Sequence, residues 1–349
     1  MKKKWIKVIS LLIILSFVIT VAGCGGGGGG KKTEGEKPAP PKRQFLTITT
    51  ASTGGTYYPI GMGMATLWTD KLKEQNINVT GQSSAGSVEN IDILRKGEAQ
   101  LAIMQGLIGA MAWSGKGKFE GNAYKELRSI SMLWPNVEHF TLVEDKVKTG
   151  NVKDIKGLGI SVGPSGSGTE ESTLIIMKGL GLTANDIKPE YLGYSESADA
   201  MKNGNIDGAS MPAGPPASAV TDLYASPTKV RVLDFTEEDL KGINSVFDTW
   251  YAYTIQPNVY PGQDKPINTI AQPNWLAVSA PTDEETVYLL TKTLFENLQE
   301  MHAVHQSAKN ITLETALDGL PAPLHAGAYK YFKEKGMNIP DRLIPPEAK

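Results

Sequence analysis

The sequence predicts an α/β protein built from two similar lobes, and three observations support this fold class. From Phe45 onward, strand-like and helix-like segments alternate, which is typical of a mostly parallel sheet covered by helices. The same order of segments then recurs further along the chain. In each half, a loop rich in glycine and hydroxyl residues precedes a helix-like segment: "ASTGGTYY" from Ala51 and "GPSGSGTEES" from Gly163.

The first half is predicted to contain strand, helix, strand, helix and strand. Alternating apolar and polar residues predict a strand over 45–52, and apolar residues at helical spacing follow the first glycine loop. A second strand is expected over 77–84. A short helix then has Ser87 as its expected N-cap and Gly97 just past its end. The third strand, over 99–106, is apolar enough to be buried on both faces.

The second half repeats this order after a strand that ends at the second glycine loop. Residues 87–103 and residues 194–210 share a pattern: serine near a helix start, apolar spacing, a basic residue and a glycine stop. We interpret the two segments as equivalent parts of two similarly built lobes. The alternative is a chance match between two common strand–helix–strand units, and gene duplication is not required.

Two segments are expected to cross between the lobes. Residues 138–147 form a strand with no helix before it, and residues 248–280 are strand-like but interrupted by four prolines. A Thr282-x-x-Glu285 capping box then begins an amphipathic helix, which we expect to pack on the first lobe with the helix after His325. The expected boundaries are 44–139 plus 276–349 for lobe I, and 140–275 with the crossings for lobe II.

The N-terminus has the features of an export signal. A lysine-rich start precedes a short apolar run and then Cys24. The run is shorter than the ~20 residues that span a bilayer comfortably, although an uncleaved membrane anchor is the alternative. The stretch 1–23 resembles a bacterial lipoprotein signal peptide, which implies lipidation of Cys24. Residues 24–43 are rich in glycine and proline and are expected to form a flexible linker. We therefore expect an extracytoplasmic protein anchored to the cell membrane by lipid.

Composition argues against several function classes. The formal net charge of −2 leaves no basic excess for nucleic acid. Cys24 is the only cysteine, so an intramolecular disulfide, thiol catalysis and a zinc–cysteine site are excluded. His302 and His305 lie three residues apart on a predicted helix and could touch one metal, but no third ligand completes a site. We favour a solvated pair or a contact at the helix C-terminus, and expect no metal.

The glycine loops lack the motifs of three enzyme classes. A phosphate-binding loop needs Lys-Ser or Lys-Thr after its glycines, whereas Gly168 is followed by Thr169 and Glu170. Neither loop has the spacing of the dinucleotide fingerprint. A hydrolase elbow needs Gly-x-Ser-x-Gly, whereas Ser165 is followed by Gly166 and Ser167. We expect no catalytic residues and no cofactor.

The second loop nevertheless has chemistry suited to an anion. Ser167-x-x-Glu170 fits a capping box, so a helix should begin there. Backbone N–H groups at that end, together with the helix dipole, favour a carboxylate. The alternative is a capped glycine turn that binds nothing. Tyr57 and Tyr58 after the first loop either line a ligand or cap the sheet.

Four segments together resemble the TAXI family of extracytoplasmic solute receptors, which serve tripartite ATP-independent periplasmic (TRAP) transporters. They occur in the expected order between about Phe45 and Met337: "ITTASTGGTYYPIGMGMA", "SAGSVENIDILRKGEAQLAIMQ", "SVGPSGSGTEES" and "LPAPLHAGAYKYFKEKG". The resemblance implies a two-lobed type II periplasmic-binding-protein fold with a ligand cleft between the lobes and no enzymatic activity. It also implies closure on a carboxylate or an acidic amino acid such as glutamate, and delivery to TRAP membrane subunits driven by an ion gradient.

The resemblance also directs attention to the residues of the two loops and the strand ends beside them. No arginine falls in either glycine loop, so we expect backbone N–H groups and hydroxyls to recognise the carboxylate. We expect a monomer. The alternatives are a sensing lipoprotein coupled to a signalling partner and an extracytoplasmic enzyme on the same fold. The candidate ligand-binding residues are Ser52, Thr53, Gly54, Gly55, Thr56, Tyr57, Gln105, Ser165, Gly166, Ser167, Gly168, Thr169, Ser195 and Pro212.

Overall fold

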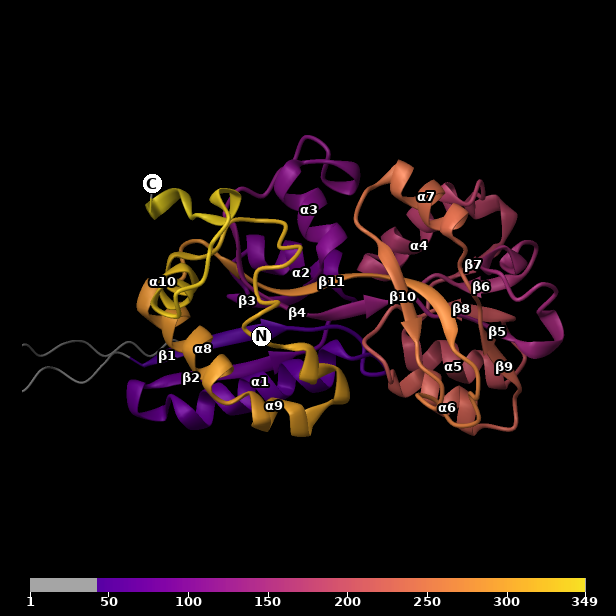
Figure 1. Ribbon diagram of the computed structural model, residues 1–349, viewed down its shortest axis with the longest axis horizontal. Helices are drawn as coiled ribbons and strands as arrows, with labels where there is room; N and C mark the ends of the chain where they lie inside the picture. Colours follow the sequence, from indigo (N-terminus) through magenta and orange to yellow (C-terminus); the bar gives the residue numbers. More distant parts are fainter. Residues whose placement is uncertain (1–42, 349) are drawn as a thin grey trace, which may run out of the picture. The chain divides into compact units, whose positions relative to one another are not determined.

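The computed structural model describes residues 43–348. The expected signal peptide, Cys24 and nearly all of the linker lie outside the described residues. The described chain forms two β-sheets covered by helices (Figure 1), so the predicted α/β class is confirmed. We call the parts built on the two sheets the first and second lobes. Within residues 43–348, no helix is both long enough and apolar enough to span a membrane.

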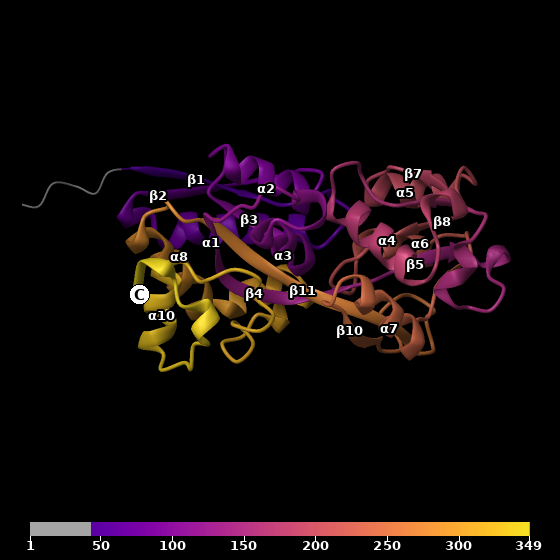
Figure 2. The same cartoon turned by 90° about the horizontal axis from the view of Figure 1, so that it is seen from above.

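The first lobe contains a six-stranded mixed sheet with the order β10-β11-β3-β1-β2, in which β4 pairs with β11. β1 is parallel to β2 and β3, whereas β11 runs antiparallel to β3, β4 and β10. Figure 2 shows β4 and β11 side by side along the centre of the molecule. The strands are β1 Gln44–Thr49, β2 Ile77–Gln82, β3 Leu101–Gln105, β4 Leu127–Val137, β10 Tyr251–Ile255 and β11 Ile267–Ser279.

Helices from both ends of the chain cover the first sheet. Trp68 of α1 is fully buried, and its indole N–H donates to the Leu290 carbonyl of α8 at 2.9 Å. This contact fixes the C-terminal helices to the N-terminal part of the lobe. The helices are α1 Tyr57–Lys71, α2 Ser87–Arg95, α3 Gly106–Ser114, α8 Glu284–Glu296, α9 Leu298–Val304 and α10 Ala326–Glu334.

The second lobe contains a five-stranded sheet with the order β7-β6-β8-β5-β9. β6 is parallel to β7 and β8, and β5 is antiparallel to β8 and β9. The strands are β5 Phe140–Val143, β6 Gly159–Ser161, β7 Lys188–Glu190, β8 Gly208–Ser210 and β9 Val230–Val232. The helices are α4 Gly168–Gly179, α5 Tyr194–Lys202, α6 Ser218–Ala225 and α7 Glu237–Val246.

Helix caps follow the sequence in some places and depart from it in others. Ser167 caps α4, and its hydroxyl accepts from the Glu170 N–H at 3.0 Å, as predicted. Ser87 is not an N-cap: Gly86 holds that position, and the Ser87 hydroxyl instead accepts from the Gln105 N–H at 3.1 Å. The predicted Thr282 cap is also wrong, because the Asp283 carboxylate accepts from the Thr286 N–H at 2.9 Å and α8 begins one residue later.

The chain passes between the lobes at two places. The first passage is the turn from β4 to β5, which contains the fully buried residues Glu138 and His139. The second leads from α7 to β10, and it contains the buried Trp250. We call these two passages, together with the adjoining ends of β4 and β11, the hinge.

Candidate functional site

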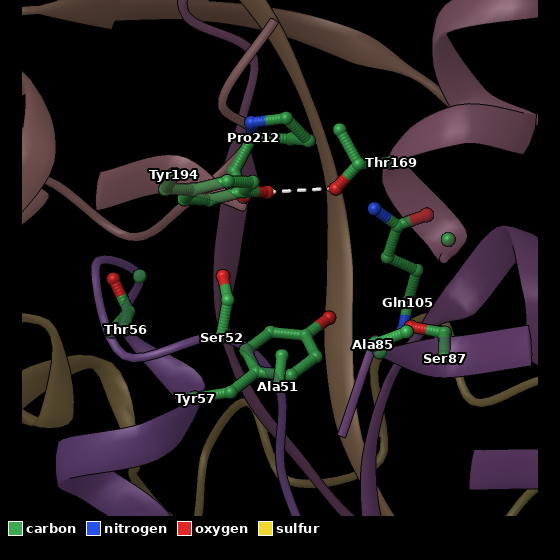
Figure 3. Close-up of a pocket in the computed structure, with 13 residues that line it drawn as sticks. Ala51, Ser52, Thr56, Tyr57, Ala85, Ser87, Gln105, Thr169, Tyr194 and Pro212 are labelled. Atoms are coloured by element: carbon green, nitrogen blue, oxygen red, sulfur yellow. Dashed lines mark hydrogen bonds between the residues drawn. The ribbon is translucent and has the colours of Figure 1, made fainter. Parts of the chain in front are cut away.

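A cavity of about 30 Å³ lies where loops and helix starts of the two lobes meet (Figure 3). A volume of this size holds roughly one or two water molecules. None of the residues that line it carries a charged side chain. They are Ala51, Ser52, Gly55, Thr56, Tyr57, Ala85, Gly86, Ser87 and Gln105 of the first lobe, and Gly168, Thr169, Tyr194 and Pro212 of the second.

The starts of five helices converge on this cavity. Each of α1, α2, α3, α4 and α5 contributes its N-cap or one of its first residues to the lining. The first N–H groups of a helix have no partner within the helix, and the helix dipole places partial positive charge there. Because no side-chain charge in the lining opposes this field, the site is suited to an anion.

The structure brings together eight of the candidate residues predicted from the sequence. These residues come from both glycine loops, from the end of β3 and from the segment after β8, so elements far apart in the chain meet at one cavity. The eight residues are Ser52, Gly55, Thr56, Tyr57, Gln105, Gly168, Thr169 and Pro212.

The other six candidates lie outside the lining, and two of them join the lobes at Gly54. A Cβ atom on Gly54 would come within 2.7 Å of both the backbone nitrogen and the hydroxyl of Ser195. The Gly54 carbonyl also accepts from the Ser218 hydroxyl at 3.0 Å. Gly54 is therefore a point of close backbone approach between the lobes, which explains the need for glycine there.

The remaining four have local or peripheral positions. Ser167 caps α4, and the Gly166 carbonyl accepts from the Glu89 N–H of the first lobe at 3.1 Å. Ser165 and Thr53 are exposed. The second glycine loop thus reaches the cavity only through its last two residues, Gly168 and Thr169.

Five lining residues were not predicted: Ala51, Ala85, Gly86, Ser87 and Tyr194. Ser87 and Tyr194 carried a usable signal, because each stands at the start of the short helix in the pattern shared by residues 87–103 and 194–210. The equivalent place of the two helices in their lobes puts both starts at the interface between the lobes.

Tyr194 is held by a defined hydrogen-bond chain, drawn in part in Figure 3. Its hydroxyl donates to the Pro212 carbonyl at 2.8 Å. The Thr169 hydroxyl lies 2.8 Å from the Tyr194 oxygen. A phenol has only one proton to donate, so Thr169 is the donor in that pair. Burial raises the pKa of Tyr194, which keeps the phenol neutral.

Tyr57 faces the cavity from the first lobe. Its hydroxyl donates to the Asn274 side-chain oxygen, and its ring packs edge-on against Trp134 with centroids 5.9 Å apart. Burial raises the pKa of Tyr57 well above its usual value. Tyr57 is therefore a neutral side chain in the lining of the cavity, and its contact with a ligand stays a prediction.

Gln105 adds an acceptor to a site otherwise rich in donors. Its side chain is 3% exposed, and its Oε1 atom has no hydrogen-bond partner. Figure 3 shows the amide beside Thr169 and Ser87. A buried amide oxygen without a partner costs free energy, so this position favours a ligand that brings a donor.

Three of the histidines, at positions 139, 305 and 325, make hydrogen bonds within the fold. Among residues 43–348, no group of three or more His, Cys, Asp or Glu side chains is placed to hold a metal ion. The His305 ring accepts from the Ser307 N–H at 3.0 Å. His325 caps α10 through a bond from the Gly327 N–H at 3.2 Å, in agreement with its predicted position at a helix start.

Solved structures similar to this chain include several periplasmic binding proteins. The aliphatic sulphonate binding protein SsuA of Escherichia coli is 16% identical, with 84% of each chain covered and a TM-score of 0.46. A TRAP solute binding protein of Sulfitobacter sp. NAS-14.1, with bound β-D-galacturonate, is 12% identical, with 83% of this chain and 91% of that chain covered and a TM-score of 0.46. A TRAP solute binding protein of Anaerococcus prevotii, with bound glucuronate, is 14% identical, with 88% of each chain covered and a TM-score of 0.42.

The family comparison covers most of the chain. A sequence profile described as the NMT1-like family matches residues 48–336. The matched range contains both glycine loops, both hinge passages and every residue that lines the cavity. The predicted α/β fold class is confirmed, since the described chain forms two mixed sheets covered by helices. The chain belongs to the NMT1-like family.

Proposed function

We propose that this protein is an extracytoplasmic solute receptor, anchored by lipid at Cys24, that captures a small carboxylate between two lobes and delivers it to TRAP membrane subunits. The sequence places the lobes at 44–139 plus 276–349 and at 140–275 with the crossings. The strands β10 and β11 of the second crossing belong to the sheet of the first lobe. The observation that carries the proposal is the convergence of five helix starts on a cavity with no charged lining side chain. Such a site offers backbone N–H groups and a positive field to a carboxylate.

The ligand is proposed to be an acidic amino acid such as glutamate. The N–H groups near Gly168 and Ser87 receive a carboxylate, and the Ser52 hydroxyl supplies a further donor. Thr169, whose hydroxyl proton goes to Tyr194, holds that phenol in the lining. The unpartnered Oε1 of Gln105 accepts from the α-ammonium group. A sugar without an anionic group leaves the field of the helix starts unused.

Ligand entry requires the lobes to separate. A cavity of about 30 Å³ has room for roughly one or two water molecules, which is less than glutamate occupies. Opening breaks bonds that now join the lobes. The Thr56 hydroxyl donates to the Gly214 carbonyl at 2.8 Å, and the Lys118 ammonium pairs with Glu171 at 2.9 Å. Closure around a ligand restores them and buries the ligand.

A calorimetric titration and a thermal-shift screen test this proposal on the purified protein. Amino acids, mono- and dicarboxylates and neutral sugars are compared. A ligand that binds only the folded protein raises the melting temperature by mass action, and we expect L-glutamate or a related acid to do so. Thr169→Val should weaken binding, whereas Ser165→Ala, in the same loop but outside the lining, should not.

Two results would contradict the proposal at different points. If only neutral sugars or nucleotides raise the melting temperature, the small-acid assignment is wrong. If an acid binds but is not taken up by vesicles that contain TRAP membrane subunits and the loaded receptor, delivery to a TRAP transporter is wrong. The second outcome would favour the sensing role that the sequence left open.

A further inference from the structure

Glu138 occupies a central place in the hinge. It lies in the turn between β4 and β5 and is fully buried. One carboxyl oxygen accepts from the Trp250 indole N–H at 3.1 Å, and the other, which faces the Gln272 amide, makes no hydrogen bond with residues 43–348. Its backbone N–H donates to the Ile270 carbonyl at 2.9 Å, and its own carbonyl accepts from the Thr269 hydroxyl at 2.8 Å. Glu138 therefore joins both passages between the lobes and the strand β11.

A row of buried polar side chains leads from Glu138 toward the ligand cavity. We call Trp134, Asn136, Glu138, Gln272 and Asn274 the hinge row. Asn136 is directly opposite Gln272, and Trp134 is opposite Asn274, in the β4–β11 pair, so these side chains share a face. Asn274 accepts from the Tyr57 hydroxyl, which lines the cavity. The hinge row thus connects the hinge to the site.

Many buried polar atoms of the hinge row have no hydrogen-bond partner among residues 43–348. Of the eleven buried side-chain polar atoms without a hydrogen-bond partner in the described chain, six belong to it. Such atoms are rare in folded proteins and cost free energy. Because these atoms are concentrated at the hinge, we expect their hydrogen bonds to change when the lobes move.

No cationic side chain of residues 43–348 compensates the Glu138 carboxyl group. The groups that face it are the Trp250 indole, the Gln272 amide and, at longer range, the phenols of Tyr57 and Tyr194. His139 is next in the chain, but its ring bonds to the Val137 carbonyl and the Tyr260 hydroxyl. Burial raises the pKa of Glu138 to about 8, because an unpaired buried carboxylate is costly.

We propose that the Glu138 carboxyl group is a proton-binding site in the hinge, and that closure of the lobes on a ligand is linked to uptake of a proton there. This inference rests on the proposed function, since it requires lobes that open. Glu138, Trp250 and Ile270 stand on different segments of the hinge, so opening alters the surroundings of the carboxyl group and admits water. A hydrated carboxyl group ionises at an ordinary pKa.

The pH dependence of closure follows from the linkage between closure and proton binding at Glu138. The closed arrangement holds the proton more tightly than the open one, so raising the pH opposes closure between the two pKa values. Ligand affinity changes by at most about tenfold for each pH unit in that range, and it becomes constant once Glu138 is ionised in both arrangements. Glu138→Gln mimics the protonated group and removes the dependence.

The first experiment measures L-glutamate binding by calorimetry in buffers of different ionisation enthalpy, between about pH 6 and about pH 8.5. The full-length protein should take up a proton on binding and lose affinity as the pH rises. Glu138→Gln should take up none and keep its affinity. Asp248→Asn, an exposed carboxylate two residues before Trp250, is the matched control and should behave as the unaltered protein. Equal pH dependence in the unaltered protein and in Glu138→Gln would overturn the proposal.

The second experiment needs no ligand and so separates this inference from the proposed function. Ionisation of Glu138 beside the Trp250 indole should change the tryptophan emission, with a midpoint near pH 8 where the ligand-free lobes stay closed and at a lower pH where they open. The change should vanish in Glu138→Gln and in Trp250→Phe. An unchanged midpoint in Glu138→Gln would overturn the assignment of the proton to Glu138, whether or not glutamate binds.

Discussion

At the scale of the residue, recognition depends on a few neutral side chains held in place by buried hydrogen bonds. Tyr194 and Tyr57 have no freedom to rotate away, because each phenol donates to a fixed oxygen, on Pro212 and Asn274 respectively. Gln105 differs from them because its buried oxygen has no partner. We therefore expect the phenols to shape the site and Gln105 to discriminate among acids.

Gln105→Met tests this discrimination. Methionine has a similar length but no amide acceptor, so the protein should lose affinity for L-glutamate by about tenfold, the equivalent of one hydrogen bond to a charged group. Binding of 2-oxoglutarate, which has no ammonium group, should change little. Calorimetric titrations with both acids provide the measurement, and Gln82→Met, an exposed change on β2, is the control. Equal losses for both acids would assign Gln105 a purely structural role.

Protonation of His139 is expected to destabilise the folded protein in acid. The Tyr260 hydroxyl accepts from the Ala217 N–H at 3.1 Å and lies 2.7 Å from His139 Nε2. His139 Nδ1 lies 2.9 Å from the Val137 carbonyl, which can only accept, so Nδ1 carries the proton and Nε2 accepts from Tyr260. Burial lowers the pKa of His139 to about 4. The neutral ring is thus the form that the fold accommodates.

The stability of the folded protein should fall with the pH, because the pKa of His139 is lower in the folded protein than in the unfolded chain. The unfolded chain takes up a proton on His139 below about pH 6.5, while the folded protein resists this until about pH 4. The stabilisation is complete above the unfolded pKa and is lost as the pH falls, by a few kcal/mol. Urea unfolding at several pH values between 4 and 7.5 should show a shallower decline for His139→Gln.

At the scale of the element, the starts of the helices form the lining of the cavity. α2 and α4 meet start to start, and Gly168 allows this approach. A Cβ atom there would lie 2.8 Å from the Ser87 hydroxyl and 2.9 Å from the Gln105 amide oxygen. The glycine is therefore required by the contact between the lobes. It is not required by the backbone conformation of α4, because its φ is not positive.

Gly168→Ala should separate closure from folding. Alanine suits a helix start at least as well as glycine, so the free energy of unfolding should fall by less than about 1 kcal/mol. The extra methyl group obstructs the closed contact with Ser87, and affinity for L-glutamate should fall by tenfold or more. Denaturant unfolding and calorimetry on the same protein supply both numbers. A large loss of stability with unchanged affinity would contradict this account.

The N-caps of α2 and α8 depend on tertiary contacts, so residue type alone does not predict them. Ser87 has the residue type of an N-cap, but its hydroxyl is used by the Gln105 N–H at the end of β3. Asp283 and Thr282 are both capping residues by type, and the choice between them depends on how α8 enters the lobe. Ser167 was predicted correctly because its partner, Glu170, is only three residues away.

At the scale of the whole molecule, a small set of polar contacts joins the lobes. The ion pair of Lys118 with Glu171 has side chains that are 42% and 17% exposed, so its contribution is modest and depends on salt. Several hydrogen bonds also cross between the lobes, among them those from Thr56, Ser218 and Glu89 to backbone carbonyls. Opening of the lobes, as proposed above, would break these contacts.

Lys118→Met tests the ion pair. Loss of the pair should favour the open arrangement by about 0.5 to 1 kcal/mol, which lowers ligand affinity by a few-fold at low salt and less at high salt. Small-angle scattering without ligand should show a larger radius of gyration. Lys116→Met, an exposed neighbour that makes no ion pair in the described chain, is the control. Identical effects of the two substitutions would exclude a specific role for the pair.

The sequence by itself determined the α/β class, the two glycine loops and the start of α4, because these depend on periodicity and on partners a few residues apart. It also identified eight of the lining residues, six in the two glycine loops and two at or after strand ends. Only the tertiary structure decided which of them meet. Tyr194 and Ser87 reach the cavity, and Ser165 does not, because sheet order places the helix starts face to face. The surroundings of Glu138 were also decided by the tertiary structure. Three segments that are distant in the chain bury its carboxyl group, and none of them places a cation beside it.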